Sequence, residues 1–181
     1  MWVSGRLVQT EVVAHRRRAA VPAEFSLSRS AVIHAAAPDV FAQIEDFHQW
    51  HAWSPRDRLD PDMTREFSGA ERGVGARYSW SGDRRAGAGS MEIVEAAAGR
   101  QVVIDLHVTR PVRAHDSVVF RLRPLGLEST DVTWTVSGRR GLLARLSGRA
   151  PDREAALGRQ LEEGLAALEE LVTTRPGRAP L

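Results

Sequence analysis

Short segments in which apolar and polar residues alternate fill most of the chain between residues 25 and 137. Alternation with a period of two is typical of strands that bury one face. It predicts strands at residues 25–34, 64–68, 74–80, 90–95, 101–109, 117–123 and 131–137. From residue 64 onward no long helix separates the strands, and turn residues punctuate them. We therefore expect an antiparallel meander and not a parallel sheet.

Two helical segments flank this pattern. The proline and aspartate of residues 36–39 suit the first turn of a helix, and apolar residues follow at spacings of three and four. Near the C-terminus, an apolar stripe opposite a row of glutamates predicts a helix of about 22 residues and about 33 Å. Its stripe consists of Leu157, Leu161, Leu165, Leu168, Leu171 and Val172. Gly158 and Gly164 each cost this helix about 1 kcal/mol relative to alanine, so we expect other groups to pack against its backbone there.

The predicted sheet has one apolar face, and the C-terminal helix is the long element able to cover it. The sequence therefore predicts an α+β fold, in which a curved antiparallel sheet of about seven strands wraps around that helix. Short helices are expected after the first strand. A sheet that curls around a single helix leaves room between them, which is a natural place for a pocket.

The chain is expected to divide into three parts. Residues 25–173 form the folded domain, and residues 174–181 form a disordered tail rich in proline and glycine. Residues 1–24 are expected to form a flexible basic leader, with four arginines against two glutamates. Contact of this leader with an anionic surface is the alternative interpretation. Basic residues contribute only about 1 kcal/mol each at such a surface, so three consecutive arginines do not predict stable attachment.

Composition excludes several classes of protein. The 181 residues include no cysteine, which excludes disulfides, thiolate metal sites and thiol nucleophiles. The net charge is only +2, and residues 1–24 account for all of it, so the folded part lacks the basic excess expected of a nucleic-acid-binding protein. All the basic side chains are arginine, a bias typical of GC-rich bacterial genomes. No apolar run approaches the roughly 18 residues that span a bilayer, and the N-terminus lacks a secretory signal, so a cytoplasmic protein is expected.

An unusual aromatic stretch, FHQWHAWSP at residues 47–55, follows the first predicted helix. It places Trp50 and Trp53 three residues apart on a short connection. Large amphipathic rings suit positions with one buried side and one side that meets a polar group or a ligand. We interpret this stretch as the entrance of a hydrophobic cavity.

The order of elements and four stretches of the sequence resemble the START-like (SRPBCC, Bet v 1-like) superfamily, and within it the polyketide cyclase/dehydrase branch. The stretches are EFSLSRSAVIHAAAPDVFAQIEDFHQWHAWSP, LDPDMTREFSGAERGVGARYSW, GAGSMEIVEA and VTWTVSG, spread over residues 24–172. The resemblance implies a helix-grip fold with a cavity for a lipid, a polyketide or a similar small molecule. Members of the superfamily are cyclases, carriers or transporters. Relatives in this branch often carry an apolar N-terminal anchor; residues 1–24 are not continuously apolar, so no stable membrane anchor is expected.

Eight residues are the candidates for contact with such a ligand, because they combine aromatic or apolar character with the face expected to be concave. They are Trp50, Trp53, Tyr78, Trp80, Met91, Trp134, Leu161 and Leu165. For each aromatic ring taken alone, an ordinary place in the core is the alternative.

Candidate catalytic residues are fewer. Tyr78 is the only tyrosine, so it is the sole phenol able to polarise a carbonyl group, and His115 beside Asp116 is a possible base. Asp105 and His107 alternate with apolar residues and are expected to face solvent, which weakens the catalytic interpretation of this region. Arg121 and Arg123 are also expected to face outward, whereas an arginine such as Arg77 or Arg113 inside the pocket would bind a carboxylate.

No metal or cofactor is predicted. His48 and His51 are three residues apart, but a catalytic zinc needs a third protein ligand, and a polar pair beside two buried tryptophans explains them better. The glycines at 73 and 75 precede a strand and open no helix, so they are not a dinucleotide-binding fingerprint. The GxSxG, HExxH and P-loop motifs are absent.

The sequence therefore predicts a protein that binds a hydrophobic small molecule between its sheet and its C-terminal helix. Two alternatives remain open. The first is a polyketide cyclase or dehydratase that uses Tyr78 and His115, and the second is a protein-interaction module with a vestigial cavity. The sequence determines neither the ligand nor the oligomeric state.

Overall fold

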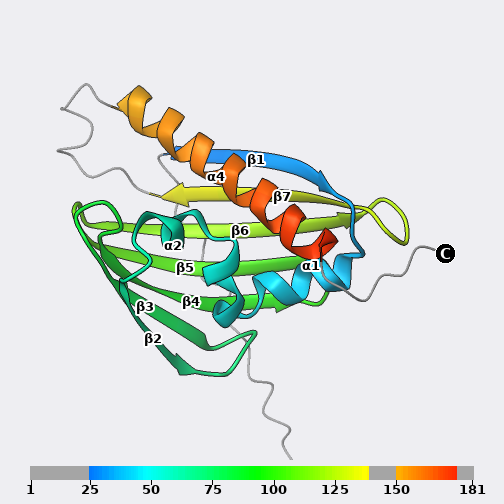
Figure 1. The fold of residues 1–181 in the computed structure, drawn as a ribbon, viewed down its shortest axis with the longest axis horizontal. Coiled ribbons are helices and arrows are strands. Elements are labelled where there is room, and N and C mark those ends of the chain that lie inside the picture. Colours follow the sequence, from blue (N-terminus) through cyan, green and yellow to red (C-terminus); the bar gives the residue numbers. More distant parts are fainter. Residues whose placement is uncertain (1–24, 139–149, 175–181) are drawn as a thin grey trace, which may run out of the picture.

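The structure, a computed structural model, describes residues 25–138 and 150–174 of the chain (Figure 1). Its elements in chain order are β1 (Phe25–Ile33), α1 (Ala37–Ile44), the 3-10 helix η1 (Phe47–Ala52), α2 (Pro55–Leu59), β2 (Thr64–Gly69), β3 (Ala76–Ser81), β4 (Ala88–Ala97), β5 (Gln101–Arg110), β6 (Ala114–Pro124), β7 (Thr130–Gly138) and α4 (Ala150–Thr173).

The seven strands of the described residues form one antiparallel sheet in the order β1-β7-β6-β5-β4-β3-β2. Strands β2 to β7 follow one another as a meander, and β1 closes the order by pairing with β7. The register places Leu27 opposite Val136 and Phe120 opposite Trp134. These pairs lie on the face that the alternation pattern marks as apolar, so the predicted antiparallel sheet is confirmed.

The helices all cover the same face of the sheet. Figure 1 shows α4 running across it next to β1, with α1, η1 and α2 beside α4 on the same side. Between the two layers lies the hydrophobic core, whose fully buried residues include Ile33, Ile44, Ile93, Ile104, Phe120, Val132, Leu165 and Leu168. A curved sheet around one long helix is the predicted helix-grip arrangement.

Two glycines of α4 lie where other groups approach the helix backbone, as the sequence predicts. A Cβ atom at Gly164 would lie 2.6 Å from the Trp134 ring and 3.0 Å from the Pro55 ring. A Cβ atom at Gly158 would overlap the guanidinium of Arg29, which pairs with Glu162. The absence of a side chain at 164 therefore allows α4 to settle against the tryptophan of β7.

Several boundaries differ from the prediction. Val74 lies before β3 and is 58% exposed, because Gly73 and Gly75 with φ of 69° and 87° form a turn there. Strand β6 begins at Ala114 and not at Ser117, so Asp116 belongs to the strand. The predicted leader (1–24) and all but the first residue of the predicted tail lie outside the described residues.

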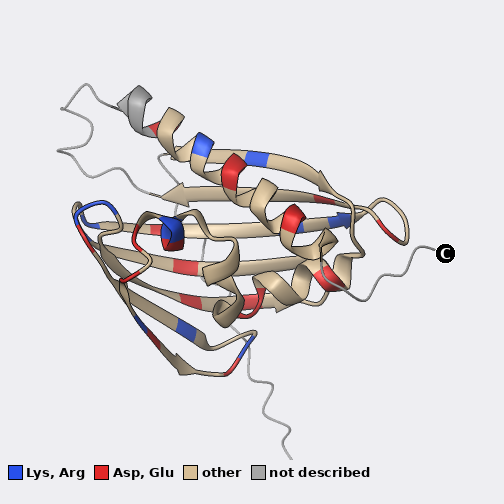
Figure 2. Ribbon diagram, viewed as in Figure 1, with Lys and Arg blue, Asp and Glu red and all other residues tan. Residues whose placement is uncertain are grey.

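Charges are mixed over the surface. Figure 2 shows acidic and basic residues interspersed over the strands and along α4. Within residues 25–138 and 150–174, no helix is both long and apolar enough to cross a membrane.

Candidate functional site

A cavity of about 230 Å³ lies between the sheet and the N-terminal half of α4. Its lining comes from segment 50–59, from strands β4 to β7, from α4 and, through Arg85, from the loop between β3 and β4. The lining residues are Trp50, Ser54, Pro55, Arg56, Leu59, Arg85, Met91, Leu106, Val108, Asp116, Val118, Trp134, Val136, Leu157, Gln160 and Leu161. Most of these side chains are apolar, as in sites that bind small organic molecules.

Strand periodicity explains most of this lining. Two pairs of lining residues lie two positions apart on a strand, and each pair therefore shares a face. They are Leu106 and Val108 on β5, and Asp116 and Val118 on β6. Leu161 projects from α4 toward this face and is 2% exposed. The cavity is therefore built on regular elements of the scaffold, whose positions the hydrogen-bonded sheet fixes.

Two tryptophans anchor the short helix η1 above the sheet. The Trp50 indole Nε1 donates to the Ile44 carbonyl at 3.0 Å, and the Trp53 indole Nε1 donates to the Gln43 carbonyl at 3.3 Å. Their rings lie 4.9 Å apart, and the Trp53 ring also meets the Trp134 ring at 5.8 Å. Trp53 is fully buried outside the lining, whereas Trp50 forms part of the cavity wall. The aromatic stretch thus shapes the cavity, partly as wall and partly as core.

Asp116 and Trp134 each bring a buried polar atom to this largely apolar wall. Oδ1 of Asp116 and Nε1 of Trp134 are buried, and neither has a hydrogen-bond partner among the described residues. Burial raises the pKa of the Asp116 carboxyl above its ordinary value, and the neighbouring His115 opposes this shift only in part. The lining of one cavity therefore includes a carboxyl group and an indole N–H donor.

The space for the Asp116 carboxyl group depends on a glycine on the neighbouring strand β7. Asp116 is opposite Gly138 in the β6–β7 register, and a Cβ atom at Gly138 would overlap the carboxyl group. The end of β7 thus lacks a side chain where the carboxyl group needs room.

Two arginines also line the cavity, and both differ from the arginines considered in the sequence. The Arg56 guanidinium lies over the Trp80 ring at 4.1 Å, and burial lowers its pKa below the ordinary value. Arg85 has a side chain that is 74% exposed and pairs with Asp83. Arg77 and Arg113 are exposed outside the cavity, so the half-buried Arg56 and the exposed Arg85 are the cations of the lining.

Tyr78 belongs to a neighbouring buried network. Its hydroxyl donates a long hydrogen bond of 3.5 Å to Asp57 Oδ1, and the same oxygen accepts a 2.7 Å bond from Arg65 Nε. Burial, followed by the charge of Asp57, raises the pKa of the Tyr78 phenol. The phenol stays protonated as a hydrogen-bond donor, but it is committed to Asp57 and not to the cavity.

The structure brings together half of the predicted ligand-binding residues. Those that line the cavity are Trp50, Met91, Trp134 and Leu161. Those that are buried in the core outside the lining are Trp53, Tyr78, Trp80 and Leu165. The alternation pattern could not separate the two groups, because cavity and core residues share one face of the sheet.

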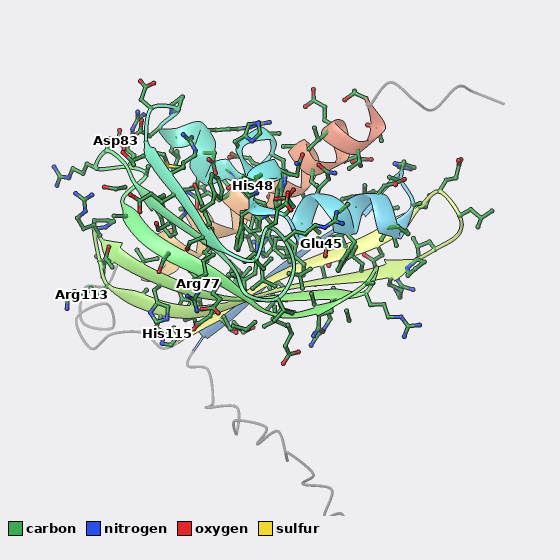
Figure 3. The ribbon with its side chains drawn as sticks, turned by 90° about the horizontal axis from the view of Figure 1, so that it is seen from below. Glu45, His48, Arg77, Asp83, Arg113 and His115 are labelled. Carbon is green, nitrogen blue, oxygen red and sulfur yellow. The ribbon has the colours of Figure 1, made fainter. Side chains whose placement is uncertain are left out.

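The two predicted catalytic residues do not meet. His115 lies on the side of the sheet away from the helices (Figure 3), where its Nε2 contacts Asp105 Oδ1 at 2.6 Å. The structure instead places Asp116, its neighbour, in the cavity. The sequence contained a signal for the inward position of Asp116, because it lies at alternate strand positions from the buried Val118 and Phe120 and so shares their face.

The other histidine pair makes local contacts. His48 Nδ1 pairs with Asp46 Oδ1 at 2.9 Å, and His51 Nδ1 lies 2.7 Å from the His48 carbonyl. The His48 ring also stacks on Phe67 with a centroid separation of 4.2 Å. These contacts fix η1 next to β2.

Comparison with solved structures shows a shared fold. A solution NMR structure from Thermobifida fusca is 21% identical, with a TM-score of 0.62 over 81% of this chain and 92% of that one. The Aha1 dimer from Colwellia psychrerythraea is 14% identical, with a TM-score of 0.61 over 84% and 99%. A START superfamily protein from Mycobacterium smegmatis is 18% identical, with a TM-score of 0.60 over 82% and 97%. A search of curated proteins found no match.

The family comparison is more direct. Residues 24–173 match the family described as polyketide cyclase / dehydrase and lipid transport, a span that includes strands β1 to β7 and helix α4. The resemblance noted in the sequence is therefore confirmed. This chain belongs to the polyketide cyclase / dehydrase and lipid transport family, and it shares its fold with the START superfamily protein from Mycobacterium smegmatis.

Proposed function

We propose that this protein binds a hydrophobic small molecule, bearing at least one hydroxyl or carbonyl group, in the cavity between the sheet and α4. The observation that carries the proposal is the pairing of an apolar wall with two buried polar atoms, Asp116 Oδ1 and Trp134 Nε1, that lack partners among the described residues. A buried polar group without a partner costs about 1–3 kcal/mol. A ligand that hydrogen-bonds both groups would remove this cost while it buries its own apolar surface.

The size of the cavity limits the ligand. A volume of about 230 Å³ exceeds the roughly 150 Å³ of an apolar cavity that holds benzene. It falls below the range of about 300–1,000 Å³ that is usual for drug-sized ligands. A molecule of one or two fused rings, or a chain of similar volume, fits this space without movement of α4.

The experiment that tests this proposal is mass spectrometry of the protein purified from its own host, first native and then denatured. A released apolar compound in near-stoichiometric amount, with an oxygen function, is the expected result. A polar or highly charged compound in the cavity would contradict the proposal. An empty protein that also fails to take up small ring compounds would favour the interaction module with a vestigial cavity.

A cyclase or dehydratase activity is the second candidate, and the environment of Asp116 favours it. Its raised pKa lets the carboxyl group hold a proton closer to neutral pH than an exposed aspartate does. Such a group can donate a proton to a leaving hydroxyl, with the Trp134 N–H as a donor to a carbonyl oxygen. On this account Asp116→Asn retains ligand binding and loses turnover. The same assay with Tyr78→Phe and His115→Ala tests the two residues predicted from the sequence.

A further inference from the structure

Three potential metal ligands meet on the outer face of the sheet, on the side opposite the cavity. They are Asp105 and His107 on β5 and His115 on β6, and one donor atom from each lies within 4.8 Å of the other two. Within residues 25–138 and 150–174 they form the only such group of three. Figure 3 shows His115 on this outer side, away from the helices.

The strand register brings these side chains together. His107 and His115 are directly opposite each other in the β5–β6 pairing, and their rings stack with centroids 3.9 Å apart. Asp105 precedes His107 by two residues and therefore lies on the same face. Its two oxygens contact the two rings, with Oδ1 2.6 Å from His115 Nε2 and Oδ2 3.3 Å from His107 Nε2.

The scaffold and the exposure of these side chains suit metal binding. Strands β5 and β6 are inner strands of the sheet, hydrogen-bonded on both sides, so the Cα positions are held firmly. The side chains of Asp105, His107 and His115 are 39%, 51% and 64% exposed, which leaves an approach for an ion from solvent. Glu92, opposite Asp105 on β4, is paired with Arg77 at 3.1 Å, so Asp105 is the carboxylate left to face the histidines.

We propose that Asp105, His107 and His115 form a zinc-binding site on the outer face of the sheet. Imidazole nitrogens and a carboxylate oxygen are donors that zinc prefers, whereas magnesium and calcium prefer oxygen ligands alone. Two donors that share a zinc ion at about 2.1 Å each lie no more than about 4.2 Å apart. The observed spread of up to 4.8 Å therefore closes with small rotations of exposed side chains.

The proposed site supplies three protein ligands, and tetrahedral zinc takes four. Water, or a side chain from another molecule, completes the coordination from the solvent side. The proposed zinc site shares no residue with the cavity. A negative result for zinc therefore leaves the ligand proposal unaffected, and a negative result for the ligand leaves the zinc proposal unaffected.

Isothermal titration of the metal-free full chain with zinc chloride tests the proposal. We expect one zinc ion per chain at this site and no binding of magnesium under the same conditions. Loss of a direct ligand should weaken zinc affinity about tenfold or more, since even partners of metal ligands contribute about 10–100-fold. The double variant His107→Ala/His115→Ala removes two ligands and should abolish binding at this site.

The matched control is His48→Ala/His51→Ala, which removes two other surface histidines, one of them also paired with an aspartate. It should leave zinc affinity unchanged. In spectra of histidine-labelled protein, zinc should shift the ring signals of His107 and His115 and leave that of His34 in place. The proposal is wrong if zinc does not bind, or if the His107→Ala/His115→Ala variant binds zinc as tightly as the parent protein.

Discussion

Asp116 on β6 and Trp134 on β7 line the same cavity, and each has a buried polar atom without a hydrogen-bond partner among the described residues. Most buried polar groups in folded proteins have partners, so two such atoms in the lining of one cavity support the proposed ligand site. A carboxyl group accepts or donates a hydrogen bond according to its protonation, and the indole N–H only donates. The pair is thus suited to an oxygen-bearing ligand.

The raised pKa of Asp116 predicts how stability changes with pH. A carboxyl group whose pKa is higher in the folded than in the unfolded state contributes stability at pH values below its ordinary pKa of 3.8. That contribution is lost as the pH rises through the folded-state pKa. Asp116→Asn should remove this dependence and make the protein more stable at pH 7, because it replaces a carboxylate disfavoured by burial with a neutral amide. Urea unfolding at pH 3.5, 5 and 7 measures it. Parallel pH profiles for the two proteins would contradict the assignment.

The two glycines of α4 form a matched pair for a second prediction. Gly164→Ala places a methyl group against the rings of Trp134 and Pro55, so we expect a loss of about 1–3 kcal/mol. Gly158→Ala meets only the flexible guanidinium end of Arg29, so the gain in helix propensity of about 1 kcal/mol should dominate. Thermal unfolding compares the two variants. Equal effects would show that α4 does not pack on Trp134 as described.

The ion pair between the buried Asp57 and the partly exposed Arg65 gives a third prediction. The Asp57 side chain is 3% exposed, and its Oδ1 accepts a 2.7 Å bond from Arg65 Nε. Arg65→Met should destabilise the fold by about 3–5 kcal/mol because it leaves a buried carboxylate without its cation. The double variant Asp57→Leu/Arg65→Met should recover most of this loss. Denaturant unfolding of both variants checks the coupling; a double variant no more stable than the single one would contradict it.

A fourth prediction concerns the volume of the cavity. Leu157→Trp enlarges a half-buried residue of the lining, whereas Leu171→Trp makes the same change at a half-buried position of α4 outside the lining. Binding of 2-naphthol, which has two rings and one hydroxyl, should weaken about tenfold or more in Leu157→Trp, which corresponds to about 1.4 kcal/mol. Leu171→Trp should bind it as the parent does. Equilibrium dialysis measures both, and equal affinities for all three proteins would place the ligand elsewhere.

The fold was largely predictable because it depends on periodicity. Alternation in Gln101–Arg110 and Thr130–Gly138 identifies strands with one buried face, and the leucine stripe identifies α4. The positions of Gly158 and Gly164 also indicated close packing against α4, which the structure confirms. Boundaries were less predictable at Val74 and Ala114, where the preceding turn decides the residue at which the strand begins.

The candidate site was only partly predictable, because a pattern shows which face a residue occupies but not whether a ligand or another side chain fills the space in front of it. The sequence marks both Trp53 and Trp134 as candidate ligand-binding residues. In the structure, Trp53 is packed in the core and Trp134 lines the cavity. Arg56 was missed because it lies in a five-residue helix that only the tertiary structure places beside Trp80. Asp116 could have been found from its parity with Val118.

The indole signals of the tryptophans test the central claim most directly. In ¹⁵N-labelled protein, 2-naphthol should shift the Trp134 N–H signal, because this donor has no partner among the described residues and lines the cavity. The Trp80 N–H, bonded to the Ala86 carbonyl at 3.1 Å, and the Trp53 N–H should move little. Naphthalene, which lacks the hydroxyl, should bind more weakly and shift the Trp134 signal less. An unchanged Trp134 signal at saturating 2-naphthol would contradict a ligand site between the sheet and α4.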